Sequence, residues 1–179
     1  MKRSELEHIV RAGSVISEDS ELVIIGSQAI LGQFPDAPIE LLESQEADVF
    51  PRNKPERSDQ IDGAIGERSL FHQTHGYYAH GVSPETATLP AGWEGRLIPV
   101  RNENTRGATG WCLEVHDLAA SKLAAGREKD LDFVGALLKH KMVDTRLLKE
   151  RLAALNLEIG RKQALEQRLN RLIANHVKS

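Results

Sequence analysis

The sequence is short of the residues that define several protein classes. It holds one cysteine, Cys112, which excludes an intrachain disulfide framework and suits a reducing compartment. It contains no run of about 18 apolar residues, so no membrane span is expected. The opening residues, MKRSELEHIV, lack the apolar region of a signal peptide, and we therefore expect a cytoplasmic location.

The composition fits a folded protein with an uneven charge. The 179 residues are 40% hydrophobic, which is enough for one domain, or for a compact core with an appended subdomain. Residues 1–116 hold 10 basic and 18 acidic side chains, whereas residues 117–179 hold 13 and 8. This asymmetry indicates an acidic site in the first part and a surface that tolerates polyanions in the second. Helical faces that are simply rich in Lys and Arg would give the same excess.

Apolar periodicity and turn residues divide the chain into a part with both strand and helix patterns and a later part with helix patterns alone. Ser4 and Asp117 are expected helix N-caps, and Gly126 is an expected helix end. The patterns predict strands over 21–27, 47–50, 77–82, 95–100 and 110–115, and helices over 4–13, 27–33, 57–67, 117–125, 130–142, 145–155 and 161–177. The predicted fold class is α+β, with a core containing a small sheet over 1–116 and a helical C-terminal subdomain over 117–179.

Two features in the first part could carry chemistry. The apolar run ELVII ends in Gly26 and Ser27 before a short helix, an arrangement that presents backbone N–H groups to a phosphate. In the stretch ESQEADVF, Glu46 and Asp48 are spaced i and i+2, so a strand would place both carboxylates on one face. Carboxylates beside a phosphate-binding turn suit Mg²⁺. A solvated edge strand would show the same spacing.

The middle of the chain offers a different interpretation. His72, His75 and His80 cluster in sequence, and His116 follows later, but their spacing matches no standard zinc site. We interpret them as structural, or as including one contact to a base or phosphate. The aromatic residues Tyr77, Tyr78 and Trp93 could stack on a base or belong to the core.

The combination VIIGSQAIL with EADVF resembles the signature of the nucleotidyltransferase superfamily, the polymerase-β-like fold. The later segment VHDLAASKLAAGREKDLDFVGALL resembles the region after the core in AbiEii-type nucleotidyltransferases, the toxin components of certain toxin–antitoxin and phage-defence systems. The resemblance covers roughly residues 20–140. It implies a mixed-sheet nucleotidyltransferase core, and an enzyme that moves a nucleotidyl group from an NTP to a hydroxyl of RNA or protein.

The resemblance also implies roles for individual residues. Gly26 and Ser27 would hold the nucleotide phosphates, and Glu46 and Asp48 would bind Mg²⁺. The helical segment would supply Lys122 and Arg127 as nucleotide contacts, with Lys122 catalytic through its contact to a phosphate. An ordinary solvated helix lysine is the other interpretation of Lys122.

In the same segment, Asp130 would be catalytic by orienting a basic group or the acceptor, although a helix N-cap is the other interpretation of this residue. A cognate antitoxin or another protein partner is implied as well.

Three departures from the family pattern keep an alternative open. The first acid is Glu46 where Asp is more usual, and the 18 residues that separate it from Ser27 form a longer gap than is usual in the family. A third carboxylate is not evident, and Glu114 is the best candidate. Because phosphoryl transfer depends on positioning and charge neutralisation, the alternative is a catalytically degenerate module that binds or regulates.

Overall fold

The computed structural model describes residues 1–176, which form two compact units. The first unit contains residues 1–86 and 97–114, and the second contains residues 87–96 and the chain from 115 onwards. The sequence-based boundary lay after residue 116; the main division of the structure follows residue 114, and the loop 87–96 groups with the later helices. No helix of the described residues is long and apolar enough to cross a membrane.

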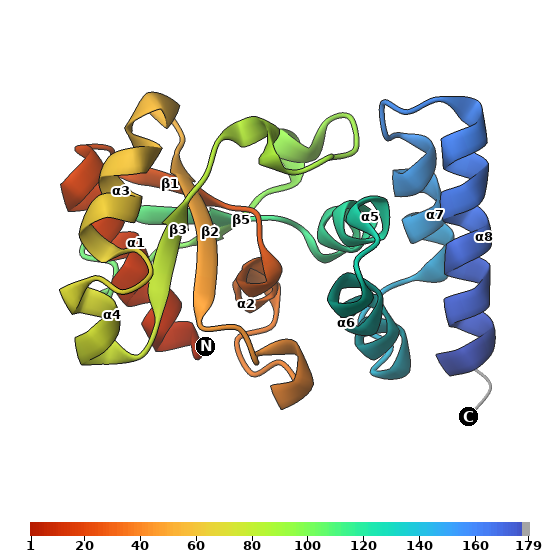
Figure 1. Ribbon diagram of the computed structural model, residues 1–179, viewed down its shortest axis with the longest axis horizontal. Helices are drawn as coiled ribbons and strands as arrows, with labels where there is room; N and C mark the ends of the chain where they lie inside the picture. The colour runs from red at the N-terminus through yellow and green to blue at the C-terminus, as the bar shows by residue number, and fades with distance from the viewer. Residues whose placement is uncertain (177–179) are drawn as a thin grey trace. The chain divides into compact units, whose positions relative to one another are not determined.

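The first unit is organised around a five-stranded mixed sheet (Figure 1). Its strands are β1 (Glu21–Ile24), β2 (Glu46–Pro51), β3 (Tyr78–Gly81), β4 (Ile98–Val100) and β5 (Thr109–Cys112), in the order β3-β2-β1-β5-β4. Strand β1 pairs antiparallel with β2 and parallel with β5, while β3 runs parallel to β2. The mixed sheet followed by a helical region confirms the predicted α+β class.

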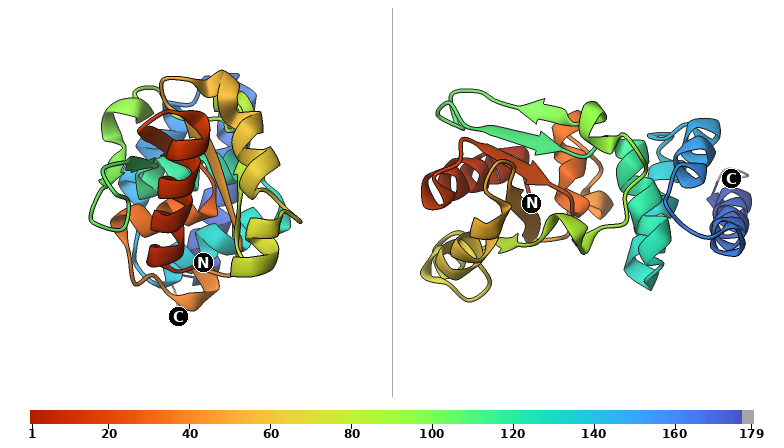
Figure 2. Two further views of the ribbon diagram at one scale, coloured as in Figure 1. Left: turned by 90° about the vertical axis from the view of Figure 1, so that its left-hand side faces the viewer. Right: turned by 90° about the horizontal axis from the view of Figure 1, so that it is seen from above.

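Helices cover one face of this sheet (Figure 2). They are α1 (Arg3–Ser17) and α3 (Ser58–Ile65), with α4 (Leu70–His75) beside β3 and the short α2 (Ile30–Gln33) beside β4 and β5. Close approaches need glycine: a Cβ on Gly81 would lie 2.0 Å from the carbonyl oxygen of Ser58. The glycine therefore lets α3 lie directly against the backbone of β3.

The alternation of side chains along β2 separates core from surface. Ala47 and Val49 are fully buried, and they pair in register with Ala79 and Gly81 of β3, on the face that α3 covers. The intervening β2 residues, Glu46 and Asp48, therefore point to the opposite face. The prediction that both carboxylates share one face is confirmed.

The second unit is helical, as predicted (Figure 1). It contains α5 (Val115–Ala125), α6 (Glu128–Lys139), α7 (Thr145–Ala153) and α8 (Ile159–His176). Residue 177, the end of the last predicted helix, lies outside the described residues. Leucines spaced at helical intervals form its core, including Leu118, Leu123, Leu137, Leu148 and Leu169. Gly126 ends α5 with a φ of +69°, a conformation that glycine adopts without strain.

Several local expectations are wrong. The N-cap of α1 is Lys2 rather than Ser4, and the Glu5 carboxylate accepts from the Lys2 backbone N–H at 2.7 Å. Asp117 lies inside α5, where it is fully buried and bound by Arg96 and Arg151, instead of capping the helix.

Helix α4 was not predicted, because its LFHQTH sequence has a single short apolar patch and buries no residue. The remaining short elements are 3-10 turns at Ser27–Ala29 (η1), Ile39–Leu41, Pro55–Arg57, Pro84–Thr86 and Trp93–Arg96.

Candidate functional site

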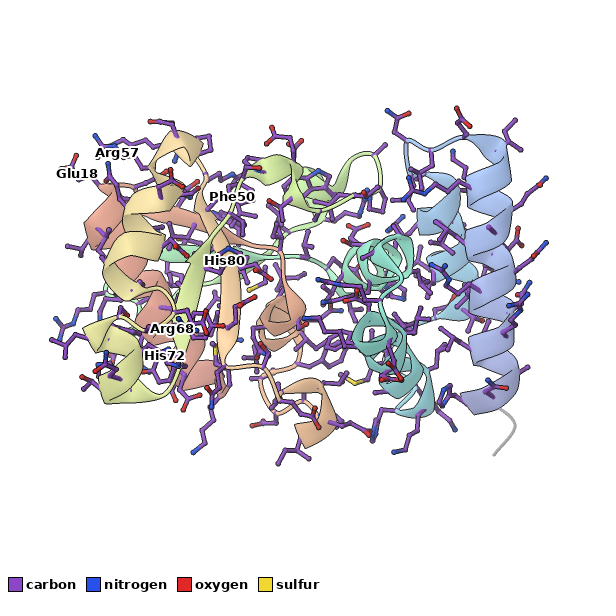
Figure 3. The ribbon with its side chains drawn as sticks, viewed as in Figure 1. Glu18, Phe50, Arg57, Arg68, His72 and His80 are labelled. Carbon is purple, nitrogen blue, oxygen red and sulfur yellow. The ribbon has the colours of Figure 1, made fainter. Side chains whose placement is uncertain are left out.

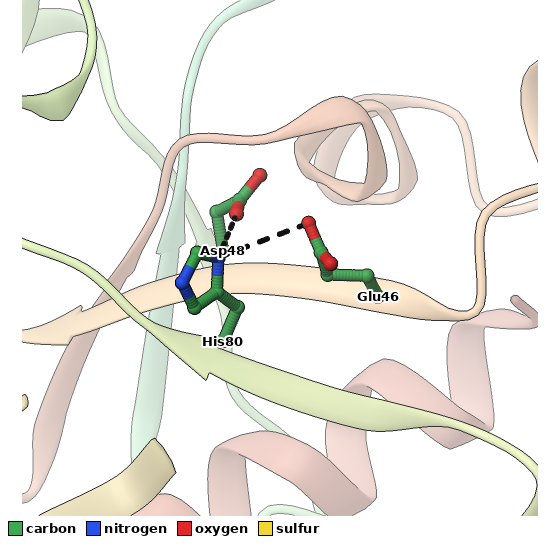
Figure 4. A group of neighbouring side chains, drawn as sticks. All are labelled: Glu46, Asp48 and His80. Atoms are coloured by element: carbon green, nitrogen blue, oxygen red, sulfur yellow. Dashed lines mark hydrogen bonds and ion pairs between the residues drawn. The ribbon is translucent and has the colours of Figure 1, made fainter. Parts of the chain in front are cut away.

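Three side chains that can bind a metal meet on the face of β2 and β3 opposite α3 (Figure 4). Asp48 lies opposite His80 in the parallel register, and Glu46 precedes Asp48 by two residues. Nδ1 of His80 lies 3.2 Å from Oδ1 of Asp48 and 3.9 Å from Oε1 of Glu46. One potential ligand atom from each of the three residues falls within 4.8 Å of the others.

The group remains open to solvent. The side chains are 38% exposed for Glu46, 27% for Asp48 and 49% for His80. Figure 3 shows His80 on β3, beside the strand that carries Phe50. A ligand can therefore reach the group without disturbing the buried core.

A tyrosine orients the first carboxylate. Tyr78 precedes His80 by two residues on β3 and so lies on the same face. Its hydroxyl donates to Oε2 of Glu46 at 2.8 Å. Burial, followed by the hydrogen bond and the charge of Glu46, raises the pKa of Tyr78 well above its usual range, so Tyr78 stays protonated as a donor.

The electrostatics of the site favour a cation. Burial raises the pKa of Asp48 above its ordinary value, and the negative charge of Glu46 raises it further, while His80 acts in the opposite direction. Two carboxylates this close repel each other when both are ionised. A bound cation would remove this repulsion and satisfy both of them.

The Gly26-Ser27 turn lies against the second carboxylate. The N–H of Ile25 donates to the carbonyl oxygen of Asp48 at 3.1 Å. A Cβ on Gly26 would lie 2.0 Å from Oδ2 of Asp48, although the φ of Gly26, −83°, is open to any residue. A Cβ here would displace the Asp48 carboxylate or the turn, so the glycine lets the turn lie in contact with the site.

The residue after this turn has unmet hydrogen-bonding capacity. Gln28 is fully buried, and neither Oε1 nor Nε2 has a hydrogen-bond partner among the described residues. Buried polar side-chain atoms are normally satisfied by protein, water or ligand. Gln28 and the half-buried Ser27 thus place polar groups on the strand–helix connection that follows β1.

Comparison with known proteins agrees with this geometry. A family model described as "Nucleotidyltransferase of unknown function (DUF6036)" matches residues 5–175. The chain belongs to this family. No curated protein and no solved structure matches it. Family membership supports the predicted nucleotidyltransferase superfamily and nucleotidyl transfer in general, and the family description specifies no nucleotide, acceptor, metal or toxin role.

The remaining predicted site residues gather in the second unit. Lys122 donates from Nζ to Oδ1 of Asp130 at 3.0 Å, and Arg127 donates from Nε to Oδ2 at 2.7 Å. Lys122 also lies 5.6 Å from the ring centre of Phe133. The predicted nucleotide contacts thus meet around one carboxylate.

That carboxylate, Asp130, does not cap α6. It lies in the first turn of the helix and is fully buried, whereas Arg127 is the N-cap residue. Burial acts to raise its pKa, but the hydrogen bonds from Arg127 and Lys122 outweigh burial and lower it. Asp130 therefore remains ionised between two basic groups.

The structure completes the carboxylate pair with a residue that sequence reasoning had not assigned to it. His80, rather than the candidate third acid Glu114, joins Glu46 and Asp48 in the group of described side chains that could hold a metal ion. The sequence pattern that could have indicated His80 was the alternation in YYAHG, where buried Ala79 separates Tyr78 from His80 and so places both on the opposite face. This pattern does not reveal which strand lies beside β2.

The donor set fits a divalent cation. Carboxylate oxygens suit Mg²⁺ and similar hard ions, and imidazole nitrogen adds a donor that first-row transition metals accept more readily. Glu46, Asp48 and His80 would hold the ion. Of the other clustered histidines, His75 belongs to a group of ring contacts with His8, Phe71 and Tyr77. Nδ1 of His72 accepts from the backbone N–H of Arg68 at 3.0 Å.

Proposed function

We propose that this protein catalyses nucleotidyl transfer from an NTP to a hydroxyl group, with a divalent cation held by Glu46, Asp48 and His80. The observation that carries the proposal is the convergence of these ligand atoms beside the Gly26-Ser27 turn. Family membership supports the reaction class. The site combines what phosphoryl chemistry requires, namely a charge-neutralising centre and a fixed position for the phosphates.

The proposed reaction is the attack of a hydroxyl group on the α-phosphorus of the NTP. The oxygen of the acceptor hydroxyl forms a bond to the α-phosphorus, the bond between the α-phosphorus and the bridging oxygen breaks, and pyrophosphate leaves. The hydroxyl proton passes to solvent. A divalent cation, when bound, neutralises charge on the transferring group and lowers the pKa of the attacking hydroxyl.

The protein's own residues position the reactants. Tyr78 fixes the orientation of Glu46 through its hydrogen bond, and β-sheet pairing fixes Asp48 relative to His80. The Gly26-Ser27 turn brings backbone close to Asp48 without a side chain in the way. We assign the β- and γ-phosphates of the NTP to this turn, where main-chain N–H groups and the Ser27 hydroxyl can donate.

Two basic groups that the family resemblance implies as nucleotide contacts lie in the second unit. Lys122 and Arg127 are held at Asp130, which keeps both charges in fixed positions. We assign Lys122 to a phosphate of the nucleotide and Arg127, which is 62% exposed, to the nucleotide or the acceptor. Asp130 orients both. The basic excess of residues 117–179 favours an RNA or acidic protein acceptor.

Labelling with α-³²P-NTP and a divalent cation tests the proposal. Glu46→Gln and Asp48→Asn remove one charge each with little change in shape, and each should reduce transfer by at least about 100-fold. Glu43→Gln, which removes a carboxylate just before β2, is the matched control and should label like wild type. If both site variants label like wild type, the site is assigned wrongly.

Calorimetry separates the catalytic interpretation from the degenerate one. Binding of NTP with a divalent cation, without turnover on any acceptor, would support a binding or regulatory module on this fold. Absence of binding would contradict both interpretations. The toxin role implied by the AbiEii-type resemblance predicts growth arrest on expression, which Asp48→Asn and a small DNA-binding partner protein should each relieve.

A further inference from the structure

The third potential ligand atom of the group is a nitrogen, at a place where a third carboxylate was expected. His80 faces Asp48 across the parallel pair of β2 and β3, and Nδ1 is the ring atom turned toward both carboxylates (Figure 4). Two donors bound to one ion at about 2.1 Å lie about 3.0 Å apart when they are neighbours in an octahedron. The 3.2 Å between Nδ1 and Oδ1 of Asp48 is close to that separation.

A nitrogen donor changes which cation the site should prefer. Mg²⁺ takes oxygen ligands and keeps much of its water, so an imidazole contributes little to its binding. First-row transition ions gain affinity from imidazole, and among them Mn²⁺ also suits carboxylate and phosphate oxygens. Replacing a third carboxylate by neutral imidazole also lowers the negative charge of the site, which weakens its electrostatic hold on Mg²⁺.

We propose that His80 is a direct metal ligand through Nδ1, and that it makes the site selective for Mn²⁺ over Mg²⁺. The proposal rests on the function proposed above in that it uses the same metal site. It replaces the Mg²⁺ predicted from the sequence by a softer ion of the same charge. Glu46 and Asp48 contribute one oxygen each, and the remaining positions are left for water or phosphate oxygens.

The strand geometry supports a ligand role over a merely orienting one. His80 is 49% exposed, and on β3 it is flanked by buried Ala79 and by Gly81, which packs against α3. Backbone pairing with β2 therefore fixes its Cα, while the ring projects from the sheet next to the carboxylates. A ring placed to hold a substrate or to fill the core would not need both carboxylates within 4 Å.

Pulsed electron paramagnetic resonance of the full chain loaded with Mn²⁺ alone tests the coordination directly. We expect ¹⁴N modulation from a bound imidazole in wild type and in the control His75→Asn, whose histidine lies on α4. The modulation should vanish in His80→Asp and in His80→Asn. The second variant adds no negative charge beside Glu46 and Asp48, so it remains informative if the first variant folds poorly.

Competition between Mn²⁺ and Mg²⁺ tests the selectivity. The ratio of Mn²⁺ to Mg²⁺ affinity should fall on the order of tenfold in His80→Asp, which restores an all-oxygen site. The proposal is overturned if wild type shows no ¹⁴N coupling, if coupling persists in both His80 variants, or if the affinity ratio does not change.

These measurements involve no NTP, so their outcome does not depend on whether the proposed nucleotidyl transfer occurs. Nitrogen coordination without any nucleotidyl transfer would leave the metal assignment standing and remove the catalytic one. Nucleotidyl transfer by a protein whose bound Mn²⁺ has only oxygen ligands would support the proposed function and contradict the assignment of His80 as a ligand.

Discussion

The close approach of Gly26 to Asp48 gives a sharp prediction. In Gly26→Ala the new Cβ would lie 2.0 Å from Oδ2 of Asp48, whereas real Cβ contacts are essentially never under 3.0 Å. The carboxylate or the turn must therefore move by about 1 Å, and a displacement of that size can reduce the rate of a positioned reaction by about 100-fold. We expect a fall of this order in nucleotidyl transfer.

The stability of Gly26→Ala should change little. The φ of −83° is accessible to alanine, and the reduced freedom of the unfolded chain stabilises by about 0.4–1 kcal/mol, which offsets part of the strain of the contact. Gly63→Ala is the matched control, because a Cβ there meets nothing within 4 Å. It should keep wild-type activity and gain roughly 1 kcal/mol as an alanine within α3.

Two assays on these variants decide the matter. Initial rates of transfer from α-³²P-NTP report the site, and urea unfolding reports the fold. Activity of Gly26→Ala within threefold of wild type would refute the idea that this glycine sets the position of Asp48. A loss of activity accompanied by an equal loss in Gly63→Ala would refute it as well, since the effect would then not be local.

Three further predictions concern buried groups. Gln28→Met should raise the free energy of unfolding in urea by about 1 kcal/mol, because it removes a buried amide without a hydrogen-bond partner among the described residues. It should also weaken NTP binding if the amide contacts the ligand. A lower free energy of unfolding would show that the amide is satisfied in the folded protein. Asp130→Asn should lower stability by about 3 kcal/mol at pH 7, because it leaves Lys122 and Arg127 without their counter-charge. The folded-state pKa of Asp130 is depressed, so its contribution is present above the unfolded value near 4 and lost as pH falls below it; the gap between wild type and variant should narrow in acid, and a constant gap would contradict this. Cys112 is fully buried with a pKa raised to about 12, so a thiol reagent at pH 8 should react with it only on unfolding, and rapid modification of the folded protein would show that the strand opens.

Local patterns predicted most of the elements. The apolar run into Gly26 and the alternation around Asp48 each describe a single strand and its neighbouring turn, so periodicity suffices for them. The leucine spacing after residue 144 likewise predicts α7 and α8 without reference to the rest of the chain.

The failures involve contacts between distant segments. Asp117 was predicted to cap α5, but Arg96 and Arg151 bind it inside the helix, and neither is near it in sequence. The prediction did not group His80 with the carboxylate pair for the same reason. The register of β3 against β2 brings together Asp48 and His80, which lie 32 positions apart in the sequence. Sequence spacing gives the face of each strand, whereas it does not say which strands are neighbours.

The parallel register of β2 and β3 has a consequence for how the site can fail. Glu46 pairs with Tyr78 and Asp48 with His80, so four functional side chains occupy a two-by-two grid on one face. A slip of β3 by one residue would keep sheet hydrogen bonds available, yet it would place Ala79 opposite Asp48. Gly81 opposes such a slip, since only a glycine fits against the Ser58 carbonyl oxygen at that position. Metal binding would therefore report the correct alignment of the two strands. A chain with a misaligned β3 would give the circular dichroism spectrum of a folded protein but would not bind the ion.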